Sequence, residues 1–295
     1  MDGNSQSRIC GSSRQSECKS LESQAFRRWR ERLTFREMSR LFTTVGSFVD
    51  RIKINALTRE TWDGRTVWIK RRRAAAGPIT VVANHFFRLV GNPVQTLRDT
   101  AWQQWEVLCF QQLHGDGFRA FSCGDDAVGA DELPGLSLAH YLSAGTLTPE
   151  MLAAAGRELR RAHEWRCDEF GGAWSHGDPH SGNFIYDAND GRARLIDFEV
   201  MHDTSLSADD RHADDLVIFL QDLMGFIAPD LWLPSACSFL KAYGRTEIIG
   251  LLAKRFVVPR GIARLWWSVR TTYLSRAELA RRIGELRTAL PSLAA

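Results

Sequence analysis

The sequence predicts an α+β fold in which a strand-rich first part precedes a mainly helical remainder. Residues 45–69 have strand character, with alternating apolar residues at 52–57 and a Trp-Asp-Gly-Arg turn at 62–65. Residues 100–113 and 148–165 show helical apolar spacing. A short β-hairpin signal lies between later helices, where an Asn-Asp-Gly turn separates two apolar runs.

The length and composition are those of an ordinary globular protein. The 295 residues can form one large domain or two lobes, and 44% of them are hydrophobic and 25% charged. The sequence has no apolar run of the ~18 residues that a membrane span needs, and no signal peptide is recognisable. The six cysteines are scattered without a C-x-x-C pair, which favours reduced thiols and a cytoplasmic location.

Charge is distributed unevenly, although the net charge is only +3. Residues 187–230 hold eleven acidic residues against three arginines, and residues 251–295 hold nine Lys or Arg against two Glu. The acidic block suits metal binding, and the basic end suits phosphate-rich partners or is simply a set of solvated helix faces. No nucleic acid partner is expected.

The first part of the chain divides into two predicted segments. Residues 1–20 are rich in Ser, Gln and Gly, and we expect a disordered tail there. Residues 21–44 contain Phe26, Trp29 and Leu33 at roughly helical spacing among arginines, which predicts a basic amphipathic helix. Such a helix can lie on an anionic membrane surface, giving a peripheral location at its inner face, or dock onto its own domain.

Residues 175–203 carry the chemistry. Asp178 lies in a loop, Asn183 precedes one strand of the predicted hairpin, and Asp197 follows the other. The hairpin therefore brings Asn183 and Asp197 close together, and their oxygens can hold divalent cations that bridge nucleotide phosphates. A separate carboxylate, that of Asp178, can orient a hydroxyl and accept its proton. This set suits phosphoryl transfer.

The same residues carry a family resemblance. His176, Asp178 and Asn183 match the kinase pattern H-x-D-x-x-x-x-N, so the sequence resembles the protein-kinase-like superfamily. The form HGDxHxxN, followed by Ile-Asp-Phe-Glu at 196–199, looks most like the aminoglycoside phosphotransferase and lipopolysaccharide core (Kdo/heptose) kinase branches. The resemblance covers about residues 45–240.

The resemblance implies a two-lobed fold and an activity. Residues 45–133 would form a small antiparallel-sheet lobe, and residues 134–295 a mainly helical large lobe. The implied reaction transfers the γ-phosphate of ATP to an acceptor hydroxyl, with Mg²⁺ as cofactor. In that reaction Asp178 would be the base, and Asn183 and Asp197 the metal ligands.

Two further residues would complete the catalytic set. Lys70 ends a Val-Trp-Ile-Lys run that resembles the family's V-A-I-K strand, where the lysine contacts the phosphates. Only five lysines stand against thirty-three arginines in the chain, so a lysine at this place is informative. Glu106 lies on a predicted helix between Trp102 and Phe110, and a carboxylate on that apolar face needs a partner, for which Lys70 is the candidate.

Nucleotide binding is predicted less sharply. Residues 131–138 resemble the interlobe segment whose backbone holds adenine, so Glu132 and Gly135 are the predicted ATP contacts. The family's glycine-rich phosphate loop is missing, and only residues 45–49 resemble it weakly. Residues 71–99 are a long insertion that reaches over the cleft or contacts the substrate; the sequence leaves its role open.

Supporting roles follow from the resemblance. His176 and His180 would position the catalytic loop, and Asp215 or Asp214, with Asp215 preferred, would brace it from the next helix. A first-turn acidic pair also fits an ordinary helix N-terminus. His163 lies on an apolar helix face and is interpreted as a packed residue.

The acceptor is the least defined part of the prediction. The interval between Asp197 and the helix after it is short and lacks the A-P-E signature of protein kinases. This favours a hydroxyl of a small molecule or of a glycan such as lipopolysaccharide. Two alternatives stay open: a protein Ser/Thr kinase, and a non-catalytic binding module on a kinase scaffold.

Overall fold

The computed structural model describes residues 55–73, 76–272 and 274–294, all of which belong to one compact unit. The predicted tail at 1–20, the basic helix at 21–44 and the glycine-containing run at 45–49 lie outside the described residues. The predicted boundary between lobes at residue 133 stays a prediction.

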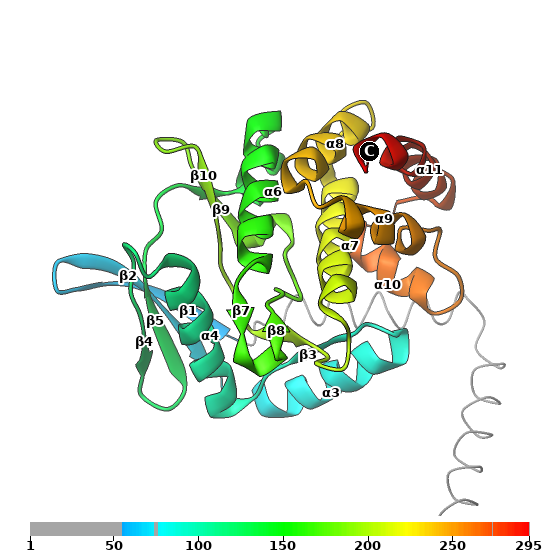
Figure 1. Ribbon diagram of the computed structural model, residues 1–295. Coiled ribbons are helices and arrows are strands. Elements are labelled where there is room, and N and C mark those ends of the chain that lie inside the picture. The colour runs from blue at the N-terminus through cyan, green and yellow to red at the C-terminus, as the bar shows by residue number, and fades with distance from the viewer. Residues whose placement is uncertain (1–54, 74–75, 273, 295) are drawn as a thin grey trace, which may run out of the picture. The chain divides into compact units, whose positions relative to one another are not determined.

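The first described elements form an antiparallel sheet of order β1-β2-β5-β4 (Figure 1). Its strands are β1 (Asn55–Trp62), β2 (Arg65–Arg72), β4 (Ala120–Cys123) and β5 (Ala127–Asp131). The predicted turn joins β1 and β2, and Asp63 and Gly64 take positive φ there (50° and 75°), as a tight hairpin requires. Helix α4 (Asp99–His114) follows the insertion and contacts β4 and β5.

The insertion is ordered. It forms helix α3 (Ala76–Val90) and strand β3 (Val94–Thr96), which pairs with β11 (Val200–His202). Pro78 is tolerated because it lies in the first turn, where its missing N–H has no helical acceptor. The Asn84 side chain bonds both the N–H and the carbonyl of Thr96 and so ties the helix to the strand.

Most of the remaining chain is helical. The helices are α5 (Leu138–Ser143), α6 (Pro149–His163), α7 (Ala208–Phe226), α8 (Trp232–Tyr243), α9 (Thr246–Arg255), α10 (Ala263–Arg270) and α11 (Arg276–Leu293). Thr148 caps α6, whose first helical residue is Pro149, a position where proline is favoured. A second sheet has the order β10-β9-β6, with β6 (Leu136–Ser137), β9 (Phe184–Asp187) and β10 (Arg192–Leu195). The short strands β7 (Arg166–Cys167) and β8 (Gly172–Ala173) pair with each other.

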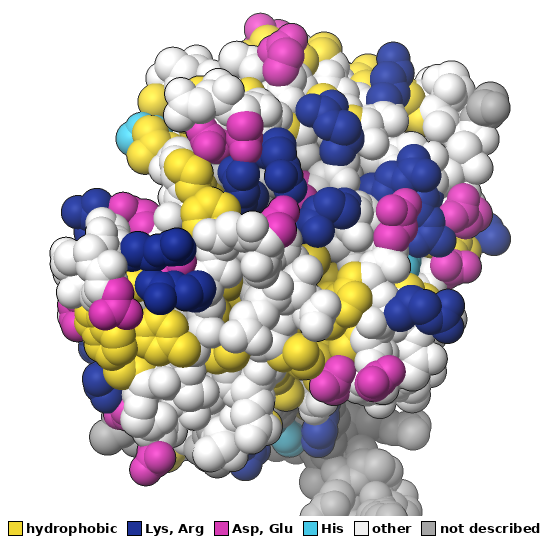
Figure 2. Space-filling view, turned by 60° about the vertical axis from the view of Figure 1, so that its left-hand side comes forward, with side chains coloured by type: hydrophobic (Ala, Val, Ile, Leu, Met, Phe, Trp, Pro, Cys, Tyr) yellow, Lys and Arg dark blue, Asp and Glu magenta, His cyan; other side chains and the backbone are white. Residues whose placement is uncertain are grey.

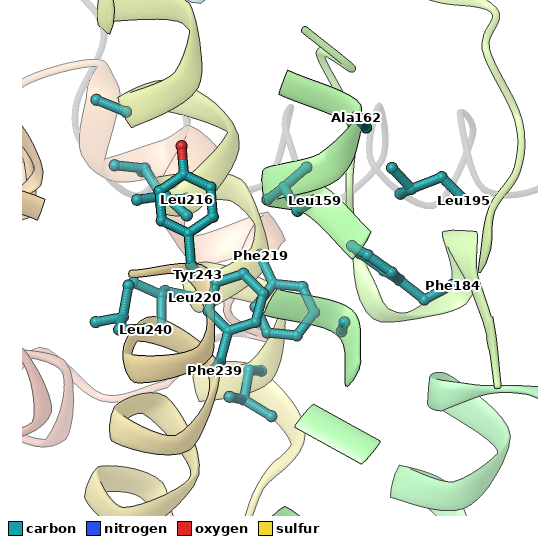
Figure 3. Close-up of a cluster of buried hydrophobic side chains, with 14 of the residues drawn as sticks. Leu159, Ala162, Phe184, Leu195, Leu216, Phe219, Leu220, Phe239, Leu240 and Tyr243 are labelled. Atoms are coloured by element: carbon teal, nitrogen blue, oxygen red, sulfur yellow. The ribbon is translucent and has the colours of Figure 1, made fainter. Parts of the chain in front are cut away.

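The core that supports the later site lies between α6, α7 and α8 (Figure 3). Phe219 of α7 stacks on Phe239 of α8 with ring centroids 3.9 Å apart, and both side chains are fully buried. Gly156 lets α6 approach α8 closely, because a Cβ there would lie 2.3 Å from the Phe239 carbonyl oxygen. The packing of α6 and α8 therefore fixes the position of α7.

The α+β fold predicted from the sequence is confirmed: a small antiparallel sheet is followed by a mainly helical part. Basic and acidic side chains are interspersed over the face shown in Figure 2, so that face has no large area of a single sign. No helix among the described residues is long and apolar enough to cross a bilayer.

Candidate active site

The hairpin β9–β10 brings two of the predicted ligands together. Phe184 pairs with Leu195, and the next N–H along, that of Ile196, donates to the Asn183 carbonyl at 3.0 Å. Asn183 and Asp197 therefore flank the same end of the hairpin, as the Asn-Asp-Gly turn predicted. The Asn183 amide nitrogen donates to the Asp178 carbonyl at 2.9 Å, which fixes the side chain and leaves its oxygen to face another group.

Helix α7 holds the loop before the hairpin. The buried Asp215 carboxylate accepts the backbone N–H groups of His176 and Gly177, both at 2.8 Å. Asp222, two turns further along α7, accepts the N–H of Ser181 at 2.8 Å. Of the two predicted braces, Asp215 makes these contacts, whereas Asp214 lies 3.3 Å from His202. The loop is thus anchored at both ends to one helix.

Two histidines shape the loop from within. His176 Nδ1 accepts the N–H of Asp178 at 3.2 Å, and its Nε2 donates to the Ile196 carbonyl at 3.1 Å. Burial lowers the pKa of His176, so the ring is neutral and can accept and donate in this way. His180 Nδ1 accepts the N–H of Gly182 at 3.1 Å. Both rings bond backbone groups, the kind of contact that a positioning residue makes.

Lys70 on β2 meets three carboxylates. Its ammonium lies 3.2 Å from Glu106 of α4 and 3.6 Å from Glu199, and it forms an ion pair with Asp197. These partners are 36, 127 and 129 positions away in the sequence. The structure thus joins the sheet, α4 and the end of the hairpin through a single ammonium group.

His163, interpreted as a packed residue, is fully buried against Tyr243 and Asp215.

The charges in this cluster do not balance. Burial opposes the charge on Lys70, yet Asp197, Glu106 and Glu199 together raise its pKa, so it stays protonated. Burial raises the pKa of Glu106 to about 7, although Lys70 opposes this shift. Lys70 is the one ammonium among these three carboxylates, and the Arg72 guanidinium acts on Glu199, so two cations against three carboxylates leave one surplus negative charge in a mostly buried place. A divalent cation would offset that surplus.

Asp197 has a strained backbone. Its φ of +68° lies in the left-handed region, which Asp and Asn occupy more readily than other residues with a side chain. This conformation turns the chain sharply between β10 and β11. Strain of this kind persists where surrounding contacts hold it, and it is frequent at functional sites. Here the ion pair with Lys70 supplies such a contact.

The donor set fits a magnesium ion. Asn183 offers an amide oxygen, and Asp197 offers a carboxylate that is about one-third exposed (36%). Mg²⁺ prefers such oxygen ligands and keeps several waters, so two protein ligands suffice. Among the described residues no group of three or more His, Cys, Asp or Glu side chains is arranged as a metal centre. The two oxygen ligands suit a metal that is bound together with a phosphate ligand.

Asp178, the predicted base, has a partner that the sequence did not indicate. Arg270 Nη1 at the end of α10 donates to its Oδ1 at 2.7 Å. Burial alone would raise the pKa of Asp178, but Arg270 and His180 hold it below its usual range. Arg270 lies 92 positions away, outside the span of the family resemblance. The only sequence signal was its spacing of four from Trp266, which puts both side chains on one helix face.

The predicted ATP contacts Glu132 and Gly135 are engaged within the protein. The Glu132 carboxylate accepts hydrogen bonds from Arg59 and Trp68, and its N–H donates to the Thr66 carbonyl. Gly135, at φ +108°, packs against the backbone of Tyr186, so no side chain fits there. A pocket of about 570 Å³ adjoins residues 131–135, and neither Lys70 nor Asp178 lines it.

The order of the elements and these contacts together decide the fold: a sheet lysine paired with a helix glutamate, a loop braced by the following helix, and a hairpin that ends in an acidic turn. The fold is protein-kinase-like. It was predicted from the sequence, and within it the predicted residues Lys70, Glu106 and Asp197 form one cluster, with Asp178 and Asn183 on the adjoining loop.

Comparison with known proteins gives structural neighbours only. No family model and no curated protein matches the chain. Similar solved structures include Rv3197 of Mycobacterium tuberculosis in complex with erythromycin (18% identity, 80% of this chain and 71% of that one, TM-score 0.38). Others are a Plasmodium vivax ethanolamine kinase (9%, 97% and 95%, 0.44) and the bifunctional kinase-methyltransferase WbdD (15%, 74% and 40%, 0.34). The fold assignment stands on the element order and the geometry of the site.

Proposed function

We propose that this chain is an ATP-dependent phosphotransferase that acts on a hydroxyl of a small molecule or a glycan. The observation that carries the proposal is the Lys70 cluster, in which one ammonium bonds Glu106 and Asp197 beside the loop that bears Asp178. A structural ion pair would need one carboxylate. Three carboxylates around one ammonium, at the end of a strained turn, instead suit a site that binds phosphates and a cation.

Each residue has a part in the proposed reaction. Lys70 places a compact positive charge against the phosphates of ATP, and Glu106 holds it in position. Asp178 orients the acceptor hydroxyl and takes its proton as the oxygen attacks the γ-phosphorus of ATP, while the bond from that phosphorus to the β,γ-bridging oxygen breaks and ADP leaves. Asn183 and Asp197 would hold Mg²⁺, which when bound neutralises charge on the transferred group. Glu132 and Gly135 keep their proposed place beside the nucleotide, through backbone groups.

The short segment after the acidic turn favours a small acceptor. Strand β11 ends at His202 and α7 begins at Ala208, and β11 is paired with β3 of the insertion. Protein kinases use a longer segment here to hold a peptide. The five residues in between leave little chain for that purpose, which supports a small-molecule or glycan hydroxyl over a protein Ser or Thr.

The test is magnesium-dependent ATP turnover by the full chain in the presence of a panel of sugars, glycolipids, aminoglycosides and proteins. We expect wild type to consume ATP, EDTA to abolish consumption, and Asp178→Asn and Asp197→Asn to lower it by at least about 1,000-fold, the scale of losing a catalytic group. Asp203→Asn, an exposed carboxylate six residues after Asp197, is the matched control. Equal inertness of wild type and the two site variants would instead favour a non-catalytic binding module, and equal turnover would show that Asp178 and Asp197 are not catalytic.

A further inference from the structure

The wall beside Asp178 is built from the insertion and α10, which lie next to each other in Figure 1. Phe86 and Phe87 of α3 pack edge-on against Trp266 of α10, with ring centroids 5.9 and 5.6 Å apart. The guanidinium of Arg270 lies over the same indole, 4.9 Å from its centroid. The wall therefore holds this arginine in place by stacking, independently of its ion pair with Asp178.

Arg270 and Asp178 are positioned by the same helix. Gly225 of α7 lies so close to the end of α10 that a Cβ there would be 2.7 Å from Thr272 Oγ1 and 2.9 Å from the Thr271 carbonyl carbon. Asp215 and Asp222, on the same α7, hold the loop that carries Asp178. Helix α7 therefore fixes both the end of α10 that carries Arg270 and the loop that carries Asp178, so the packing of the fold holds these two side chains together.

This pairing conflicts with the proposed role of Asp178. A carboxylate that accepts a hydrogen bond from an arginine is a weaker base, and the Oδ1 of Asp178 is not free to meet a hydroxyl. Removing the carboxylate from Arg270 would in turn leave a guanidinium that is only 16% exposed without a counter-ion. Among the described residues, Asp178 is the only hydrogen-bond partner of this guanidinium, so its other N–H groups can meet a ligand.

We propose that Arg270 is the acceptor-binding residue of this enzyme and selects acceptors that carry an anionic group, a carboxylate or a phosphate, near the reacting hydroxyl. The anionic group of the acceptor replaces Asp178 as the ion-pair partner of Arg270. The Asp178 carboxylate is then free to accept the proton of the hydroxyl. A neutral acceptor leaves the ion pair intact. A cationic one, such as an amino sugar, is repelled. This inference rests on the proposed function and specifies its acceptor class.

Binding tests the assignment without any turnover. Isothermal titration of the full chain uses two matched sets: glucuronate, glucose and glucosamine, and glycerol 3-phosphate and glycerol. We expect one or both anions to bind and their neutral and cationic counterparts to bind at least about tenfold more weakly, because a charge-assisted pair is lost. The two sets distinguish a carboxylate from a phosphate. Absence of binding by both anions overturns the proposal.

Two variants decide whether Arg270 is responsible. Arg270→Gln should weaken anion binding about 30-fold or more, and Arg270→Lys should restore part of it, since a lysine keeps the charge but not the bidentate fork. Arg260→Gln, an exposed arginine ten residues earlier, should change nothing. Thermal melts of all three confirm folding. Anion binding that survives Arg270→Gln, or an equal loss of Mg-ATP binding in that variant, overturns the assignment to the acceptor.

Turnover separates this inference from the proposed function. In transfer assays with the same acceptors, Arg270→Gln should lower kcat/KM for the anionic acceptor about 30-fold or more and change the value for the neutral one less than about threefold. Faster transfer to the neutral or cationic member by wild type contradicts the inference while leaving the phosphotransferase intact. A wild type that binds the anion through Arg270 but never consumes ATP contradicts the proposed function alone.

Discussion

Two groups of carboxylates in this protein occupy opposite environments. Asp215 is fully buried, yet it accepts two backbone N–H groups and a bond from His163 at 2.9 Å. The neighbouring histidines, His202 first and then His163, hold its pKa far below the usual value, against the effect of burial. Asp197 is partly exposed and shares one ammonium with Glu106 and Glu199. The first group is satisfied within the fold, and the second has charge left over.

The difference shows how to separate structural from functional acidic residues. A buried charge whose lone pairs are all met by fixed dipoles holds the chain together, and removing it leaves donors stranded. A surplus charge at an open, strained turn contributes little to folding and is available to a ligand. A substitution of Asp215 should therefore lower the free energy of unfolding, whereas a substitution of Asp197 should lower activity and leave that free energy nearly unchanged.

The largest effect on stability should come from Asp215→Ala. The change leaves two backbone N–H groups and His163 without an acceptor in the core, and we expect a loss of about 3–5 kcal/mol in the free energy of unfolding. Denaturant unfolding at pH 7.5 measures it. Asp214→Ala is the control, because its carboxylate makes one long bond to His202, and it should cost about 1 kcal/mol. Equal losses in the two variants would mean that the buried contacts of Asp215 stabilise the fold no more than the single bond of Asp214 does.

The stability of the fold should also depend on pH through His212, which stacks on His163, a hydrogen-bond partner of Asp215. His212 stacks on His163 at 3.9 Å, accepts from Arg245 at 2.9 Å and donates to the Trp174 carbonyl at 2.8 Å. Burial, together with the neighbouring His163, lowers its pKa to about 2. In the folded state the His212 ring therefore stays unprotonated at a pH where the same ring in the unfolded chain, with an ordinary pKa near 6.5, takes up a proton.

The direction in which stability changes with pH follows from the difference between the folded and unfolded pKa of His212. A lowered pKa in the folded state gives stability that is complete above about pH 7.5 and is lost as the pH falls through 6.5. We expect His212 alone to cost about 1.4 kcal/mol between pH 7.5 and 5.5. Unfolding curves at both values, for wild type and His212→Gln, measure the difference, and the variant should lose correspondingly less. An unchanged pH dependence in the variant would mean that His212 is protonated in the folded state.

Much of the site was predictable because its signals are local or rest on rare residues. Asp178, Asn183 and Asp197 lie within twenty positions and are joined by a hairpin whose turn is recognisable. Lys70 stood out because lysine is scarce in this chain, and Glu106 because it interrupts an apolar helix face. In each case a short pattern limited the possible neighbours.

The rest depended on contacts between distant segments. The role of the insertion was left open by the sequence, and its Gly77-Pro78 pair lies in the first turn of α3, where proline is allowed. The pairing of β3 with β11, and of Arg270 with Asp178, spans about a hundred residues in each case and leaves no periodic signal. The contact of Arg270 with Asp178 is set by how α7 and α10 pack, and packing is decided by side-chain shape rather than by pattern.

The smallest expected change in the free energy of unfolding is that of Asp197→Asn, which directly tests the contrast between Asp197 and Asp215. Asparagine tolerates the left-handed φ of +68° and relieves the excess of carboxylates around Lys70, so the free energy of unfolding should change by less than about 1 kcal/mol. Asp197→Ala should cost about 1 kcal/mol more, because alanine is strained in that conformation. Parallel denaturant curves for the two variants isolate the backbone contribution from the charge. If Asp197→Asn destabilised the protein as much as Asp215→Ala does, the carboxylate would be a structural brace, and the surplus charge around Lys70 would no longer indicate a ligand site.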